Sequence, residues 1–433
     1  MDKHNVLASS GYRNYIKDLN FVALIRNQIV GQTSILFCSG VLLIGISILT
    51  GILNTRFLGP EGYGIYSFVL AIISFLSIFF GFGFGSAGAR LVALTPNEER
   101  EREVLGGSIF IGICISFLLS VTIFISSFFT DWIFKTNINR LLVLLSVIGG
   151  VLQLQLMIGQ VCQGANRILE LAVFNLLPKL WYLVALTIVV LVYDLNAFLA
   201  LFLNFGSILI ACLIMIRRLK PTFKNLNHSL KSLRKETKEY GFHVYIGSVA
   251  DTSSYRLDNL FIASFVNTTS VGFYTLATTL TSPISTLSRS LSISLFKDFT
   301  KTKKIDKKVI LFNLIWLAIC TIFLVVAGEF IVVTFFSRKF LPVVPLILPL
   351  ALAVFFQGMY QPFNMFLNAK GKGRELKQAA LVEALFNVIS NLVLIYLYGA
   401  MGAAISSAIA KAIELAFNIY FYKQTTKEVA TYK

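Results

Sequence analysis

A dozen apolar stretches, each of roughly 18 to 25 residues, run through the chain and constrain its fold more than any other feature. Such a stretch crosses the ~30 Å hydrocarbon core of a bilayer as a helix that rises ~1.5 Å per residue. The segment IFIGICISFLLSVTIFISSFF, residues 109–129, is the clearest of them. With 56% hydrophobic and 14% charged residues, the chain has too little charge for a water-exposed exterior. The sequence therefore predicts an all-α membrane protein.

Read in order, the apolar stretches predict twelve transmembrane helices in two sets of six. The first set is expected at residues 32–54, 63–86, 104–129, 140–163, 170–193 and 195–216. The second set is expected at residues 242–264, 270–293, 309–336, 343–367, 377–398 and 400–421. The resulting organisation is a cytoplasmic amino-terminal segment (1–31), an N-lobe (32–216), a cytoplasmic linker (217–241), a C-lobe (242–421) and a cytoplasmic tail (422–433).

The distribution of basic residues predicts which side of the membrane each loop occupies. With the amino terminus assigned to the cytoplasm, 29 of the 38 lysines and arginines fall in cytoplasmic segments, 5 in outside loops and 4 within spans. Basic loops are retained in the cytoplasm, so this bias favours twelve spans with both termini inside. Retention and contact with anionic membrane lipids also account for the net charge of +17, and no nucleic-acid partner is expected.

The amino-terminal segment carries charges throughout, without the apolar core and small-residue cleavage site of a signal peptide. Its apolar residues recur at helical spacing, which fits either a helix on the membrane surface or a frayed tail. They are Tyr12, Tyr15, Ile16, Leu19, Val22 and Ile25.

A short internal echo indicates that the two halves are related. Phe57, Gly64 and Tyr66 match Phe265, Gly272 and Tyr274 in order and spacing, each set at the first outside hairpin of its half. Since each half has an even number of spans, the halves share one orientation and are related by a pseudo-two-fold axis along the membrane normal. A cleft between two such bundles that opens alternately to either side is typical of a transporter.

Neither the cysteines nor the histidines form a pattern typical of a metal, cofactor or catalytic site. The five cysteines lie singly within predicted spans, where a thiol usually behaves as a small hydrophobe. The three histidines are scattered along the chain, away from carboxylates at ligand spacing. We therefore expect neither a metal nor a cofactor.

Charged residues within the spans are the strongest pointers to a functional site, because an unpaired charge at bilayer depth costs at least ~2.5 kcal/mol. Lys179 lies about midway along the fifth span, and the unusually polar seventh span contains Asp251, Arg256 and Asp258. The hydroxyl-rich eighth span contains Arg289. Its serines and threonines fit either a polar wall of a cleft or hydrogen bonds to their own helix backbone.

Three further charged residues have two interpretations each. Arg90 ends the second span and fits either the central cavity or contact with lipid headgroups. Lys411 and Glu414 are spaced to neutralise each other within the twelfth span, or to contact a substrate. We take Arg90, Lys179, Arg256, Asp258, Arg289 and Lys411 as candidate substrate-binding residues. Asp251, Asp258 and Glu414 are the candidates for ion coupling.

Five motifs together resemble one family. They are RFLGPEGYGIY (residues 56–66), QGANR (163–167), RLDNL (256–260) with VGFY (271–274), NAKGK (368–372) and YGAMGAA (398–404). They are similar to motifs of polysaccharide flippases of the Wzx type, in the multidrug/oligosaccharidyl-lipid/polysaccharide exporter superfamily. The resemblance covers roughly residues 30–425.

This resemblance implies a MATE-like fold of two six-helix bundles and a flippase rather than an enzyme. The implied substrate is an undecaprenyl-pyrophosphate-linked oligosaccharide of an O-antigen, capsule or exopolysaccharide pathway, moved across the bacterial cytoplasmic membrane by alternating access. Polymerase and chain-length proteins of that pathway are the implied protein partners. Arg256 and Asp258 match the motif of the seventh span, whereas Lys179 and Arg289 rest on the charge argument alone.

Two other functions remain as alternatives. A multidrug exporter of the same fold would bind organic cations and favour acidic and aromatic residues in its cavity, and the seventh span carries both signs of charge. A membrane-bound polymerase or transferase is the more remote alternative. Such an enzyme would be expected to carry a large outside loop or a His/Asp catalytic cluster, and the sequence shows neither. Transport of an organic cation by the purified protein in vesicles would favour the multidrug exporter.

Overall fold

The computed structural model describes the backbone of residues 28–95 and 97–431 and most of their side chains. Within these ranges the regular structure is helical, and no strand occurs. The predicted surface helix of residues 1–31 falls almost wholly outside the described part.

The first half of the chain contains seven helices. They are α3 (Gln28–Phe79), α4 (Phe84–Leu94), α5 (Glu98–Phe134), α6 (Asn139–Gly149), α7 (Val151–Gly164), α8 (Ile168–Val192) and α9 (Ala197–Leu219). A short helix, α10 (Leu226–Glu236), and a π-helical turn, η1 (Thr237–Gly241), lead into the second half.

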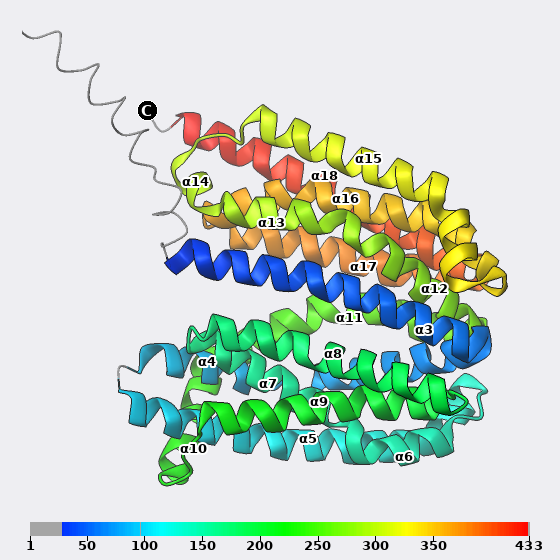
Figure 1. Ribbon diagram of the computed structural model, residues 1–433. Coiled ribbons are helices and arrows are strands. Elements are labelled where there is room, and N and C mark those ends of the chain that lie inside the picture. Colours follow the sequence, from blue (N-terminus) through cyan, green and yellow to red (C-terminus); the bar gives the residue numbers. More distant parts are fainter. Residues whose placement is uncertain (1–27, 96, 432–433) are drawn as a thin grey trace, which may run out of the picture.

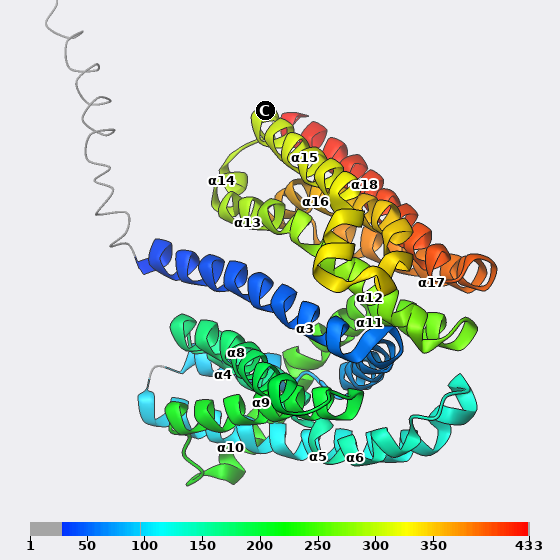
Figure 2. The same ribbon diagram turned by 45° about the vertical axis from the view of Figure 1, so that its right-hand side comes forward.

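The second half begins with α11 (Phe242–Phe265), followed by α12 (Thr268–Thr281), the 3₁₀ turn η2 (Ser282–Ser285), α13 (Thr286–Ser294) and α14 (Phe296–Lys301). It continues with α15 (Lys307–Ile331), the turns η3 (Val332–Phe336) and η4 (Arg338–Val343), α16 (Val344–Ala369), α17 (Gly373–Tyr398) and α18 (Ala400–Thr431). Figures 1 and 2 show α5 to α9 on one side and α13 to α18 on the other, with α3 and α11 running between them.

These helices supply the twelve predicted crossings. Nine helical segments in the described part are long and apolar enough to span a membrane. One of them, in α3, contains both of the first two predicted spans. The remaining two crossings are α11 and the α12–η2–α13 segment, whose serines, threonines and charges lower their hydropathy.

The first outside hairpin differs from the expected loop, because helix continues through it. A single break occurs within α3 at Gly59, where φ is 66° and ψ is −179°, and Pro60 follows. The positive φ suits glycine, and proline suits the first turn of the helix that follows. The second predicted span also ends early, because α3 stops at Phe79 and a turn at Gly81–Gly83 precedes α4.

The linker is fastened to the first half along its length. The backbone N–H of Thr222 donates to the carbonyl of Arg102 at 2.9 Å, and Asn225 donates to the Glu103 carboxylate. Leu233 of α10 is fully buried. At the end of the linker, Gly241 approaches Gly83 so closely that a Cβ atom on Gly241 would lie 2.3 Å from the Gly83 carbonyl oxygen.

Candidate functional site

The two halves meet at the predicted outer end through the echoed glycines. A Cβ atom built on Gly64 would lie 2.5 Å from the Thr268 carbonyl oxygen, and one built on Gly272 would lie 2.9 Å from the Gly64 Cα atom. Residues that occupy equivalent positions in two related halves are expected to meet where the pseudo-two-fold axis passes. Only glycine allows the backbones of α3 and α12 to approach this closely.

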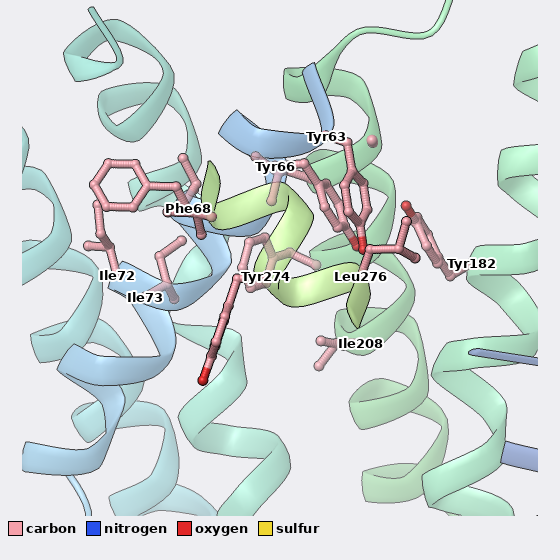
Figure 3. Packing of buried hydrophobic residues seen from close by; sticks show 14 of the residues in the cluster. Tyr63, Tyr66, Phe68, Ile72, Ile73, Tyr182, Ile208, Tyr274 and Leu276 are labelled. Atoms are coloured by element: carbon pink, nitrogen blue, oxygen red, sulfur yellow. The ribbon is translucent and has the colours of Figure 1, made fainter. Parts of the chain in front are cut away.

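Side chains around the glycines extend the contact. The Arg56 guanidinium donates to the carbonyl oxygens of Phe335 at 2.7 Å and Thr334 at 2.5 Å. The rings of Tyr63 and Phe340 pack edge to face with centroids 6.1 Å apart. Figure 3 shows the helix that carries Tyr63 and Tyr66 crossing the one that carries Tyr274. We call the Gly64–Gly272 crossing with these contacts the outer seal.

Asp258 of α11 lies at the centre of a buried hydrogen-bond network in the second half. Its carboxylate accepts hydrogen bonds from the Tyr274 hydroxyl at 2.7 Å, the Asn391 amide at 2.6 Å and the Ser407 hydroxyl at 3.2 Å. Asn391 also donates to the side-chain oxygen of Asn387 at 2.9 Å. Asp258 is only 5% exposed, so these donors replace water around its charge.

Lys411 continues this polar core on α18. Its ammonium group lies 2.7 Å from a carboxylate oxygen of Glu414 and 3.1 Å from one of Glu383. All three side chains are less than 10% exposed. If all three side chains are ionised, the two carboxylates and one ammonium group have a net charge of −1. The predicted Lys411–Glu414 pair is confirmed.

Helical periodicity brings the members of the network together. Glu383, Asn387 and Asn391 recur every four residues on α17, which places them on one face. Ser407, Lys411 and Glu414 recur at spacings of four and three on α18, which packs along α17. Five members of the network were not predicted as site residues from the sequence: Glu383, Asn387, Asn391, Ser407 and Tyr274. A polar residue every four positions in an apolar helix was the signal for those on α17.

The remaining candidate residues do not join this network. Lys179 is half-buried near the middle of α8 and Arg289 is exposed on α13, and neither has a hydrogen bond or ion pair with any described residue. Arg90 forms an ion pair with Glu236 at 2.6 Å and lies 4.7 Å from the Tyr240 ring centroid. The side chains of Asp251 and Arg256 lie outside the described part.

The hydroxyl groups of the eighth span mostly serve their own helix. Those of Thr278, Thr279, Thr281 and Ser282 donate to carbonyl oxygens three or four residues earlier, at 2.8 to 3.2 Å. Beyond the η2 turn, Ser290 donates in the same way at 3.0 Å. These hydrogen bonds favour the second of the two interpretations of the hydroxyl groups.

Comparison with known sequences relates the chain to one family. The profile of the family described as polysaccharide biosynthesis protein matches residues 29–296. An uncharacterized membrane protein of Methanocaldococcus jannaschii is 24% identical over 407 residues, which cover 89% of this chain and 95% of that protein.

Solved structures show the same fold. A lipid II flippase MurJ in an inward closed conformation superposes with a TM-score of 0.67 at 16% identity, covering 91% of this chain and 89% of that one. An inward-facing multidrug resistance MATE family transporter of the MOP superfamily superposes with a TM-score of 0.69 at 14% identity, covering 90% and 95%. The predicted two-bundle, MATE-like fold is confirmed.

Proposed function

The chain belongs to the polysaccharide biosynthesis protein family, and from this premise we propose that it flips an undecaprenyl-pyrophosphate-linked oligosaccharide across the bacterial cytoplasmic membrane. The repeat unit of an O-antigen, capsule or exopolysaccharide would pass from the inner to the outer leaflet. Both termini would lie in the cytoplasm, and polymerase and chain-length proteins of the pathway would receive the product. A closed outer seal is what this proposal expects of the state that loads substrate from the inside.

The observation that carries this proposal is the ammonium group of Lys179 within the membrane, which has no hydrogen bond or ion pair with any described residue. Tyr182, one turn further along α8, is buried and donates a hydrogen bond from its hydroxyl to Asn54 of α3 at 2.8 Å. Lys179 therefore lies on the side of α8 that is directed towards α3, which runs between the halves. A cation held there without a carboxylate is suited to a pyrophosphate.

Loss of the gene gives the primary test. Cells that lack the protein are expected to accumulate a diphosphate-linked oligosaccharide on the cytoplasmic leaflet, because synthesis continues while transfer stops. Extraction of lipids and mass spectrometry identify the compound. A glycosidase or lectin that reaches only the periplasmic side should neither cleave nor bind it, which shows that it lies in the cytoplasmic leaflet. Normal lipid-linked oligosaccharide, together with transport of an organic cation by the purified protein in vesicles, would instead support the multidrug exporter.

We further propose that the network around Asp258 couples transport to an ion gradient. The carboxylate is buried among oxygen-bearing side chains, and the amide oxygen of Asn391 is buried without a hydrogen-bond partner in the described part of the chain. Either a proton on Asp258 or a hard cation such as Na⁺ held by these oxygens would neutralise the carboxylate. The packing of α11 against α12, α17 and α18 would respond to that change.

The substitution Asp258→Asn keeps the shape of the side chain and removes its charge. We expect the rate of transport into vesicles to fall at least tenfold and to become independent of both a pH gradient and a Na⁺ gradient, because an amide cannot exchange a proton or charge-balance a cation. Asp298→Asn, at an exposed position of α14, is the matched control and should leave the gradient response unchanged. A gradient response of Asp258→Asn equal to that of the native protein would contradict the coupling proposal.

A further inference from the structure

A cavity with both polar and apolar side chains in its lining lies where α4 and α7 of the first half meet the start of α11. Its volume is ≈ 230 Å³, and it adjoins a second hollow of ≈ 370 Å³, with Ser86 and Gln160 lining both. It lies towards the predicted cytoplasmic end, beside the Gly81–Gly83 turn. We call the two spaces together the glutamine cavity, after Gln153, Gln160 and Gln163 of α7.

Amide and hydroxyl groups dominate the polar lining of the glutamine cavity. Gln153 is buried and donates to the Phe80 carbonyl oxygen at 3.2 Å, which fixes its amide. Gln160 and Gln163 are exposed and have no hydrogen-bond partner in the described part of the chain. Each of these free amides offers both a donor and an acceptor to a ligand.

Aromatic rings complete the lining. Tyr245 lines the smaller space and Tyr240 the larger. The Tyr245 hydroxyl donates to the Phe79 carbonyl oxygen at 2.8 Å, so its ring is held in place. A fixed ring beside free amides suits a ligand with one apolar face and several hydroxyl groups.

Among the described residues of its lining, Arg90 is the only one with a charged side chain, and this guanidinium is already paired with Glu236. A phosphate is best held by unpaired cations, and an organic cation by an unpaired carboxylate or by a cage of several aromatic rings. A neutral sugar ring matches amides, hydroxyls and tyrosine rings with neither requirement.

We propose that the glutamine cavity binds sugar residues of the lipid-linked oligosaccharide and selects the substrate by its sugar. This inference rests on the proposed flippase function. It assigns separate tasks to two places in the protein, since the pyrophosphate is held by cations such as Lys179 and the sugar by the amides of α7. The contributions of the two sites to affinity can therefore be measured separately.

Two probes separate the contributions in full-length protein reconstituted in nanodiscs. One is undecaprenyl pyrophosphate, and the other is the lipid-linked oligosaccharide extracted from cells that lack the gene. The dissociation constant of undecaprenyl pyrophosphate divided by that of the lipid-linked oligosaccharide measures how much the sugar adds to affinity. Gln160→Leu should reduce that ratio about tenfold while the affinity for undecaprenyl pyrophosphate stays unchanged, because the lost hydrogen bonds are made to the sugar alone.

Three variants test the assignment to this cavity. Gln155→Leu makes the same change on α7 outside the lining and should keep the ratio. Gly85→Ala should lower the ratio without removing any polar group, because its Cβ atom would lie 1.7 Å from the Gln160 side-chain oxygen and displace that flexible amide. Lys179→Ala should weaken both probes equally, so the ratio is retained.

The outcomes distinguish this inference from the proposed function. If the native protein binds both probes and Gln160→Leu leaves their ratio unchanged, the sugar is bound elsewhere and the inference is wrong while the flippase proposal stands. If the native protein binds neither probe, the proposed function itself fails. A ratio lowered by Gln160→Leu and Gly85→Ala but not by Gln155→Leu supports the glutamine cavity as the sugar site.

Discussion

Replacement of Lys179 by alanine is expected to reduce export of the lipid-linked oligosaccharide by at least roughly 100-fold. Removal of one partner of a desolvated charge pair typically costs ~3–5 kcal/mol, and each ~1.4 kcal/mol is a factor of ten. No described carboxylate pairs with Lys179, so the pyrophosphate of the substrate is the group that would lose its partner. Polymer production in cells and transfer in vesicles both measure the loss.

Matched variants separate charge from shape and folding. Lys179→Met keeps the length of the side chain and should be as inactive as the alanine variant, whereas Lys179→Arg should retain activity. Lys339→Ala, at an exposed position of the predicted outer end, should behave like the native protein. Arg256→Ala is expected to abolish export on sequence grounds, and membrane insertion should be normal in every variant. Full activity of both Lys179→Ala and Arg256→Ala would remove the cationic-cavity hypothesis.

Substitution of Gly64 by alanine should weaken the outer seal and shift the protein away from its closed outer state. The added Cβ atom would lie 2.5 Å from the Thr268 carbonyl oxygen and 2.8 Å from the Thr269 Cα atom, and backbone cannot move aside as a side chain does. Overpacking of this kind costs ~1–3 kcal/mol, which changes the ratio of the two states by roughly 5- to 150-fold. Export should fall correspondingly, and hydrogen exchange at residues 268–274 should rise.

The pseudo-two-fold relation adds a reciprocal expectation. Gly272→Ala should show the same phenotype, because its Cβ atom would lie 2.9 Å from the Gly64 Cα atom. Gly206→Ala on α9, where a Cβ atom would meet nothing within 4 Å, is the control for a glycine replaced in a span. Normal export and native hydrogen exchange in Gly64→Ala would show that this contact does not limit closure.

The sequence was enough to predict the number of membrane crossings, because the hydropathy of each segment and the basic residues of its flanking loops do not depend on how the segments pack. It was less informative about breaks within helices. Residues 55–62, between the first two predicted spans, were expected to form a loop, yet α3 passes through them with one break at Gly59, and Arg56 donates hydrogen bonds to the backbone of the second half. Hydropathy does not report such packing.

The candidate site was predicted in part for a similar reason. Charges stand out in an apolar span, so Asp258, Lys411 and Glu414 were identified, and the structure places them in one polar core. Asn387 and Asn391 carry no charge, and their role depends on which helix face meets Asp258. The polar lining of the glutamine cavity likewise comes from segments far apart in the chain, and only the fold brings them together.

The packing of the linker limits how the two halves can move. Residues from Thr222 to Glu236 form hydrogen bonds and an ion pair with α4 and α5. This part of the linker is therefore expected to move with the first half rather than act as a flexible connection. The segment between the bundles is then reduced to η1, the π-helical turn that ends at Gly241 and continues directly into α11. Two rigid bodies joined at so short a connection would rock about it, so the distance travelled by any point would grow with its separation from Gly241. The outer seal, at the far end of α11, lies on the longest lever arm and opens widest for a given rotation.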